Sequence, residues 1–283
     1  MFIDMHVHPT FFEPISEDND IKLKEFRQNS LNIHQNSIAP LEHIYNQMKC
    51  ANLDKLCLLP QDYSSIYGRT IVSNEDIHKI VNLNKNAFIG FASVDPFTNN
   101  CLEKLDYAFN ELKLSGLKLN PSKLKFYPYD ERLLPIYDMC VKYNKPIIFH
   151  SGFSWEDDTL SKYSRPIEFE ELALKYKKLR ICLAHFGWPW VQETAMLMSK
   201  YRNIYADTAL LYFDSAKEFF MQVFTKDIPI TWIERSIRHQ VMFGSNNPRF
   251  EQIRMANSIL DIGFTTSTLD LIKYKNALDF LNI

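Results

Sequence analysis

The sequence predicts a (β/α)8 TIM barrel, and two observations favour this fold. Short apolar runs of strand length alternate along the chain with longer segments of helical period, which is typical of strand–helix units on a parallel sheet. The chain has 283 residues, close to the size of about 250 residues that one such barrel commonly has. We therefore expect residues 1–283 to form one domain.

Eight strands are expected from the apolar runs. Their predicted ranges are 2–8, 55–60, 87–93, 115–120, 146–151, 180–186, 203–208 and 240–246. The predicted helices lie near 40–52, 75–84, 101–113, 131–143, 167–178, 189–201, 213–224 with 230–238, and 249–260. A C-terminal helix near 266–281 follows Gly263, a residue type that often ends a helix. An open doubly wound sheet is the alternative, but it normally has a glycine-rich turn after its first strand. The first strand here ends in His6-Val7-His8-Pro9.

The segment 10–39 is long for a connection between a strand and a helix. Connections of this length usually form lids or contact substrate. Its apolar residues include Phe11, Phe26 and Leu31, which indicates that much of the segment packs. We therefore predict an insertion after the first strand that acts as a lid.

Composition and charge limit the classes of partner. Thirty-two basic residues against 34 acidic ones give a net charge of -2, and no long block of one sign argues for nucleic acid or an anionic membrane. No apolar run approaches the roughly 20 residues of a membrane span, and the N-terminus does not resemble a secretory signal. The five cysteines form no C-x-x-C pair, which suits reduced thiols in the cytoplasm. We expect a cytoplasmic protein with a small-molecule partner.

Histidines and one asparagine stand at the carboxyl ends of predicted strands. They are His6 and His8 on the first strand, His150 on the fifth, His185 on the sixth and Asn246 on the eighth. Barrel active sites are built on the face where the carboxyl ends of the strands meet. Imidazoles that converge there can share a divalent metal. The sequence therefore predicts a metal centre on this face.

Strand alternation predicts which side chains point inward. It places Asp4 with His6 toward the barrel interior and Met5 toward the helices. On the sixth strand it places Cys182 on the face opposite His185. This argues against Cys182 as a nucleophile beside His185.

Six short segments resemble the blocks of one protein family. They are Asp4-Met5-His6-Val7-His8, Gly90-Phe91-Ala92-Ser93-Val94-Asp95-Pro96, Gly116-Leu117-Lys118-Leu119, Phe149-His150-Ser151-Gly152, Ala184-His185-Phe186-Gly187 and Phe243-Gly244-Ser245-Asn246-Asn247-Pro248. In this order they resemble the amidohydrolase-related metal-dependent hydrolases, a branch of the amidohydrolase superfamily. That branch includes lactone hydrolases and decarboxylases of the aminocarboxymuconate-semialdehyde type. The resemblance covers nearly the whole chain.

The resemblance implies a ligand set and a catalytic group. One divalent metal ion, commonly zinc, would be held by His6, His8, His150 and the strand-eight residue, which is an aspartate in the family and Asn246 here. His185 would take the acid/base position. Some relatives carry a carboxylated lysine where Lys118 lies, although the Gly-Leu-Lys-Leu context resembles the single-metal branch. The resemblance also allows a homodimer, but no segment of the sequence marks an interface.

Asn246 makes the chemistry the main question. An amide supplies no negative charge and accepts no proton at physiological pH. Three imidazoles can still hold zinc and lower the pKa of its water to about 7, so proton transfer would pass to His185. Three interpretations follow: a working enzyme with an altered site, a chain altered to trap a complex, or a descendant that kept the pocket without the reaction. The four strand-end histidines favour the working enzyme.

Residues in the loops after the strands suggest the substrate class. Rings such as Trp155 and Trp188 could form a flat apolar wall. The side chains that could bind a carboxylate are Arg69, Lys118, Arg165 and Arg249. We therefore expect a metal-dependent hydrolase of a small cyclic or aromatic organic acid, lactone or amide. The alternatives are a non-oxidative decarboxylase of an aromatic carboxylate and a barrel that only binds.

Overall fold

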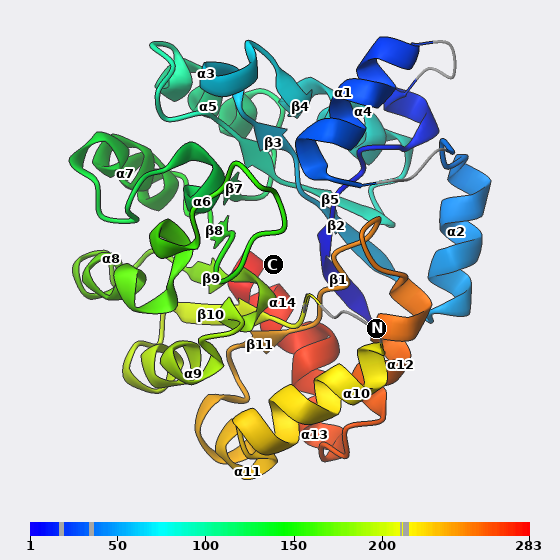
Figure 1. Cartoon of the computed structure of the whole chain (residues 1–283), viewed down its shortest axis with the longest axis vertical. Helices are drawn as coiled ribbons and strands as arrows, with labels where there is room; N and C mark the ends of the chain where they lie inside the picture. Colours follow the sequence, from blue (N-terminus) through cyan, green and yellow to red (C-terminus); the bar gives the residue numbers. More distant parts are fainter. Residues whose placement is uncertain (17–19, 34–36, 210, 212–214) are drawn as a thin grey trace.

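The computed structural model describes residues 1–16, 20–33, 37–209, 211 and 215–283. Parallel strands occupy each of the eight predicted positions (Figure 1). They are β1 (Ile3–Val7), β2 (Lys55–Leu58), β5 (Phe88–Gly90) with β6 (Ala92–Ser93), β7 (Leu117–Leu119), β8 (Ile147–Phe149), β9 (Ile181–Leu183), β10 (Ile204–Asp207) and β11 (Val241–Met242).

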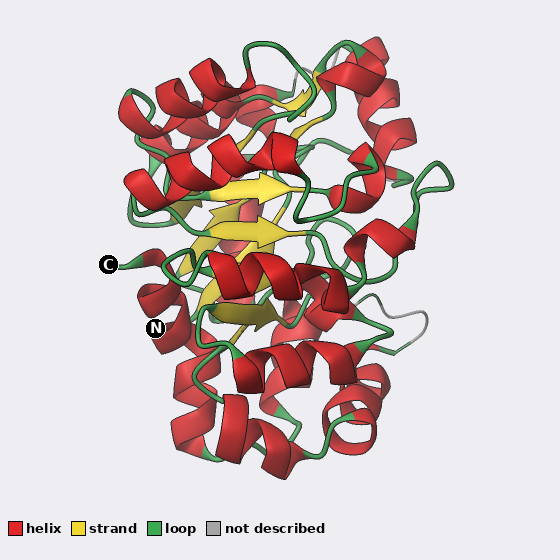
Figure 2. Ribbon diagram, turned by 90° about the vertical axis from the view of Figure 1, so that its left-hand side faces the viewer, coloured by secondary structure: helices red, strands yellow, loops and turns green. Residues whose placement is uncertain are grey.

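Neighbouring strands pair in chain order around the barrel. One set of pairs runs β1-β2-β5 and the other runs from β6 through to β11. The ring closes where the Met5 N–H donates to Phe243 O at 2.9 Å and where Val7 pairs with Asn247. The strands point in one direction inside a layer of helices (Figure 2), so their carboxyl ends share one face.

Helices follow the strands as predicted. They are α2 (Leu41–Cys50), α4 (Asn74–Leu83), α5 (Cys101–Asn110), α7 (Leu134–Lys142), α8 (Glu170–Lys175), α9 (Val191–Lys200), α10 (Ala216–Met221), α11 (Ile230–Trp232), α12 (Gln252–Leu260), α13 (Thr266–Asp270) and α14 (Asn276–Leu281). The structure adds the strand pair β3 (Gln61–Asp62) and β4 (Thr70–Val72), with α3 (Ser64–Tyr67) between them and α6 (Pro121–Leu124) further on. Elements this short carry no detectable periodicity, so sequence patterns could not predict them. No helix of the described residues combines the length and apolar character that crossing a bilayer requires.

The core has two apolar layers. The inner layer fills the barrel with Ile3, Met5, Cys57, Leu59, Ile89, Phe91, Ile148, Cys182, Ala184, Tyr205 and Met242, and it continues onto Ala277, Phe280 and Leu281 of α14. The outer layer lies between strands and helices. Figure 1 shows α14 near the centre of the ring of strands. The barrel is therefore packed solid beneath the face that carries the histidines.

The predicted faces of β1 are wrong for its first half. Met5 packs in the inner layer, whereas Asp4 accepts hydrogen bonds from Ser245 and from Gln252 of α12. The cause is a bulge: Asp4 pairs with Leu56 but Val7 pairs with Leu58, so β1 has one extra residue. An extra residue inverts the alternation along a strand. As a result, the neighbouring side chains of Met5 and His6 both point toward the barrel interior.

The predicted faces of β9 are wrong for the same kind of reason. Cys182 lies in the inner layer, on the barrel side where His185 also lies. His185 and Phe186 have φ of 59° and 50°, so the chain turns through left-handed conformations after the strand. This turn brings His185 back toward the interior. Burial holds the pKa of the Cys182 thiol well above its usual range, which keeps it a neutral thiol.

The insertion contributes the helix α1 (Ile21–Leu31). Arg27 of α1 is 3% exposed and donates to the backbone oxygens of Thr10, Ile15 and Ile71. These bonds hold α1 against the rim of the barrel. Its last residue, Leu31, lines the pocket described below.

Candidate metal centre and active-site pocket

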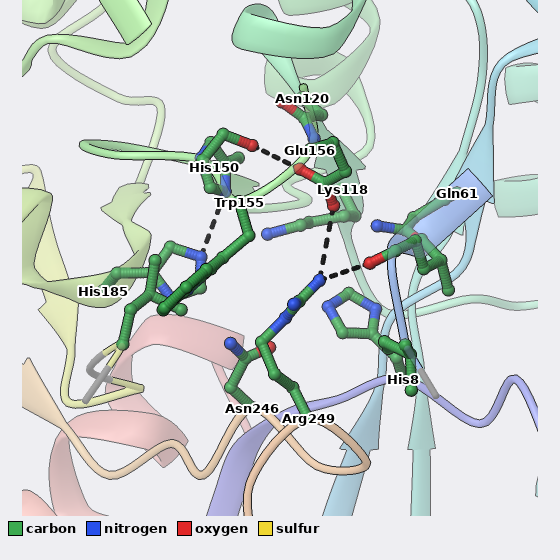
Figure 3. A pocket seen from close by; sticks show the side chains of 14 residues that line it. His8, Gln61, Lys118, Asn120, His150, Trp155, Glu156, His185, Asn246 and Arg249 are labelled. Atoms are coloured by element: carbon green, nitrogen blue, oxygen red, sulfur yellow. Dashed lines mark hydrogen bonds and ion pairs between the residues drawn. The ribbon is translucent and has the colours of Figure 1, made fainter. Parts of the chain in front are cut away.

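Six of the predicted site residues line one pocket on the carboxyl-end face. They are His8, Lys118, Trp155, His150, His185 and Asn246. The pocket has a volume of about 480 Å³, including its open mouth. Figure 3 shows these side chains turned toward a common space. His6 is fully buried and lies directly beside His8.

The rings of His6 and His8 meet through their Nε2 atoms, which are 3.2 Å apart. The Nδ1–H of His6 donates to Asp207 Oδ2 at 2.8 Å, and the Nδ1–H of His8 donates to Leu59 O at 3.0 Å. Each neutral ring has one N–H, so both facing Nε2 atoms carry a lone pair. Two ligands of tetrahedral zinc lie about 3.3 Å apart at normal Zn–N distances. The pair therefore fits a shared cation.

His150 and His185 form the other side of the centre. The Nε2 of His185 lies 3.1 Å from Nδ1 of His150, and the Nδ1–H of His185 donates to Ala209 O at 2.6 Å. His185 thus presents a lone pair to His150, whose Nδ1–H donates to it. The Nε2 of His150 is buried and has no hydrogen-bond partner among the described residues. That atom is free to bind a metal.

Burial keeps these imidazoles in the form that binds metals. It is the largest cause holding the pKa of His6, His150 and His185 well below the usual value. Burial, followed by the charge of Lys118, lowers the pKa of His8 to about 3. Neutral imidazole is the ligand form of histidine.

Asp207 is a site residue for which the sequence suggested no role. Its Oδ1 accepts the backbone N–H of His185 at 2.8 Å and that of Ala209 at 3.1 Å. Its Oδ2 accepts from His6, and the Cys182 thiol lies 4.0 Å away. Its position at the end of the seventh strand was the available signal.

The ligand atoms of His6, His185 and Asp207 all lie within 4.8 Å of one another, and neither His8 nor His150 belongs to that group of described residues. A carboxylate has about four acceptor sites, and in Asp207 they already face donors. The His6 atom facing Asp207 is also its protonated nitrogen. We therefore favour Asp207 as the group that orients His6, an arrangement common beneath metal-binding histidines.

Asn246 lies at the rim of the centre, with its side-chain amide toward the pocket (Figure 3). Its backbone N–H donates to His6 O at 2.9 Å, which ties the eighth strand end to the first. Two residues earlier, a Cβ on Gly244 would stand 2.9 Å from the Cβ of His6. Only glycine allows this close approach, so Gly244 helps to place His6.

Lys118 brings a charge into the pocket. Its side chain is 2% exposed, and its Nζ has no hydrogen-bond partner in the part of the chain that the structure describes. Burial lowers the pKa of Lys118 to about 8, opposed by attraction to Asp207. The ammonium is therefore still mostly protonated at neutral pH and faces the space between the histidines.

Two predicted substrate contacts lie elsewhere. Arg69 is exposed and stacks on the Phe26 ring at 4.7 Å, while Trp188 packs edge-on against Phe153 and Phe219. Neither is among the residues that line the pocket. Their place in sequence after a strand did not determine which way the loop carried them.

The pocket also has a wall of which the sequence suggested only Arg249. Gln61, Asn120, Glu156 and Arg249 line it. Arg249 was one of several cations considered for a carboxylate, and Glu156 carried no signal. They come from loops whose course the strand pattern does not specify.

A cluster of histidines on the carboxyl-end face of a parallel barrel is typical of the class of metal-dependent barrel enzymes. Residues 3–283 match the model of the family described as Amidohydrolase, and the chain belongs to that family. Its superfamily consists of metal-dependent enzymes, as the resemblance indicated. No curated protein sequence matches this chain.

Solved structures share the fold along the whole chain. An uncharacterised TIM-barrel protein from Bordetella bronchiseptica is 18% identical with a TM-score of 0.77, covering 99% of this chain and 98% of that one. A 4-oxalomesaconate hydratase from Rhodopseudomonas palustris is 18% identical with a TM-score of 0.67, covering 100% and 96%. A dihydroxybenzoic acid decarboxylase from a Polaromonas species, with bound manganese and 2-nitroresorcinol, is 14% identical with a TM-score of 0.68, covering 99% and 96%. The predicted barrel is confirmed.

Proposed function

We propose that this chain is a metal-dependent enzyme that removes carbon dioxide from a small aromatic or cyclic organic acid. One observation carries the metal part of the proposal: the facing Nε2 lone pairs of His6 and His8, 3.2 Å apart. Without a cation the two lone pairs repel each other. The ligands proposed are His6, His8 and His150, with the Asn246 oxygen as a weak fourth.

The proposed cofactor is a single divalent ion, with zinc as the first candidate because the ligands are imidazoles. Manganese is the second, since one solved relative contains it. Such an ion supplies Lewis acidity, which polarises a carboxylate or carbonyl oxygen and lowers the pKa of water. When bound at His6, His8 and His150, it would also favour an anionic substrate. With Asn246 in place of an aspartate, the centre keeps one more positive charge.

The remaining pocket residues suit a planar acid. Lys118 Nζ offers an ammonium beside the histidines that has no hydrogen-bond partner within the described part of the chain, and Trp155 offers an aromatic face on the same pocket. An ammonium binds a carboxylate strongly where water is excluded. An aromatic wall favours a flat ring.

The groups in the pocket that can accept or donate a proton favour decarboxylation over hydrolysis. Hydrolysis needs a group that takes a proton from water. In the family this group is the aspartate at the end of the eighth strand, and here Asn246 replaces it. Decarboxylation breaks the bond between the ring carbon and the carboxylate, releases carbon dioxide, and leaves the electron pair on the carbon. That carbon then takes a proton. Lys118 Nζ is a buried pocket group that carries one, because the pKa of Lys118 is about 8.

The neutral His185 supports a second candidate, hydrolysis of a lactone or amide. Its Nε2 carries a lone pair beside His150, which is the state that a general base requires. The low pKa of His185 makes it a weak base. For this reason hydrolysis ranks second.

The test is to load the purified protein with zinc or manganese and supply hydroxybenzoates and, separately, a panel of lactones and amides. We expect carbon dioxide release from an aromatic acid, abolished by chelation and restored by metal. Turnover of lactones without carbon dioxide release would favour the hydrolase. Absence of bound metal and of turnover would favour a barrel that only binds. We also propose a cytoplasmic location, since the five cysteines are free thiols, and we keep the homodimer as a proposal.

A further inference from the structure

Arg249 and Glu156 form an ion pair inside the pocket, and the pair is loose. Arg249 Nη2 lies 3.5 Å from Glu156 Oε1, with the side chains only 17% and 13% exposed. By contrast, Arg165 holds Glu193 through two nitrogens, with the shorter contacts at 2.9 and 2.5 Å. An arginine that is mostly buried normally holds its carboxylate through a close, two-pronged contact. The guanidinium of Arg249 could therefore bind a carboxylate more closely than it binds Glu156.

Each member of the pair has a second partner. Arg249 Nη2 donates to Leu31 O at 2.5 Å, which anchors the guanidinium beneath the end of α1. Glu156 Oε2 accepts a hydrogen bond from Ser154. If the pair separates, Arg249 keeps its place and Glu156 keeps a donor. Opening the pair thus leaves neither side chain without a partner.

The charges around the pocket show what could separate the pair. Among the described residues, the lining contains the cations Lys118 and Arg249 and one carboxylate, Glu156. Figure 3 draws the ion pair between Glu156 and Arg249 as a dashed line and shows the Lys118 ammonium in the same pocket. A molecule with one acidic group at the histidine centre would leave Arg249 with Glu156. A molecule with two acidic groups could place one at the histidine centre and the other on Arg249.

We propose that Arg249 and Glu156 form an exchangeable ion pair that sets substrate specificity. Glu156 occupies the guanidinium in the free protein, and a second acidic group on the substrate takes its place. The inference rests on the proposed function for the first acidic group only. It narrows the substrate class to a small diacid, because exchange is favourable only for a carboxylate that binds Arg249 more closely than Glu156 does.

The test measures binding by calorimetry with two probes, benzoate and isophthalate, which differ by one carboxylate. In the wild type we expect isophthalate to bind about tenfold more tightly than benzoate, the change that one added charge-assisted contact produces. Glu156→Gln removes the competitor, so isophthalate should gain about a further tenfold while benzoate changes little. Arg249→Gln should abolish the preference. Asp157→Asn, an exposed neighbour, is the control and should behave as the wild type.

Arg249→Lys serves as the second variant if Arg249→Gln fails to fold. It keeps the positive charge but loses the two-pronged guanidinium contact, so it should reduce the preference for isophthalate over benzoate. The inference is overturned if the preference survives in both Arg249 variants. Weaker isophthalate binding by Glu156→Gln, or no isophthalate binding by either the wild type or Glu156→Gln, would also overturn it. The titrations are repeated on metal-free protein. A preference that depends on Arg249 there supports the ion-pair exchange even if no metal or turnover is found.

Discussion

His6 and Asp207 are joined by a buried hydrogen bond, Nδ1 to Oδ2 at 2.8 Å, that links the first and seventh strands of the barrel. The same carboxylate receives the backbone N–H of His185. One aspartate therefore fixes the proton of His6 and the position of His185. The site depends on this group although Asp207 is not among the residues that line the pocket.

Asp207→Asn tests this relationship. An amide presents a donor where Asp207 has an acceptor, so the tautomer and orientation of His6 are no longer fixed. We expect metal affinity to fall by about 10–100-fold, as for other groups that orient metal ligands. Competition with a metal-binding dye measures the change. Asp261→Asn, at an exposed pair with Lys217, is the control, and an equal loss there would contradict the role given to Asp207.

Lys118→Met tests the proton donor. We expect kcat to fall by about 100-fold or more, the usual contribution of a positioned acid. Lys118→Arg keeps the positive charge, but a guanidinium does not release its proton. This variant should therefore preserve KM better than kcat. Because the pKa of Lys118 is about 8, the wild-type rate should also decline as pH rises through that value. A flat profile to pH 9.5 would argue against Lys118 as the donor.

Asn246→Asp tests the altered ligand. A carboxylate adds charge to the centre, so we expect metal to bind more tightly and a carboxylate substrate to bind less tightly. Carbon dioxide release should therefore show a higher KM. A large gain in lactone or amide hydrolysis instead would mean that the natural site is a weakened hydrolase.

The fully buried Asp4 predicts an unusual pH dependence of stability. Burial raises the pKa of Asp4 to about 6, above its value in the unfolded chain, so the folded state binds the proton more tightly. Its contribution to stability is fully present below about pH 4 and is lost as pH rises through about 6. The shift corresponds to about 3 kcal/mol. The free energy of unfolding of the wild type relative to Asp4→Asn should fall between pH 4 and 7, and a constant difference would contradict this.

The sequence predicted the order of the barrel because strand and helix periods repeat along the chain. The histidines at the strand ends were visible for the same reason. Local backbone geometry was not visible in the sequence. The bulge in β1 and the left-handed turn at His185 each reversed an expected face. Periodicity describes regular strands and cannot place such departures.

The pocket wall was predictable only in part. Lys118 and Trp155 line it as expected, while Arg69 and Trp188 do not. Arg249 reached the pocket through its bonds to Leu31 and Glu156, which belong to segments distant in sequence. Such contacts depend on how the loops pack, and no pattern in one segment specifies them.

We propose that His6, His8 and His150 together hold one divalent ion. The most direct measurement is an anomalous-difference map at the metal absorption edge from crystals of protein purified without added metal and then given one equivalent of zinc. We expect one peak at about 2.0–2.1 Å from the Nε2 atoms of these three histidines. No peak, or a peak bound instead by His185 and Asp207, would contradict it.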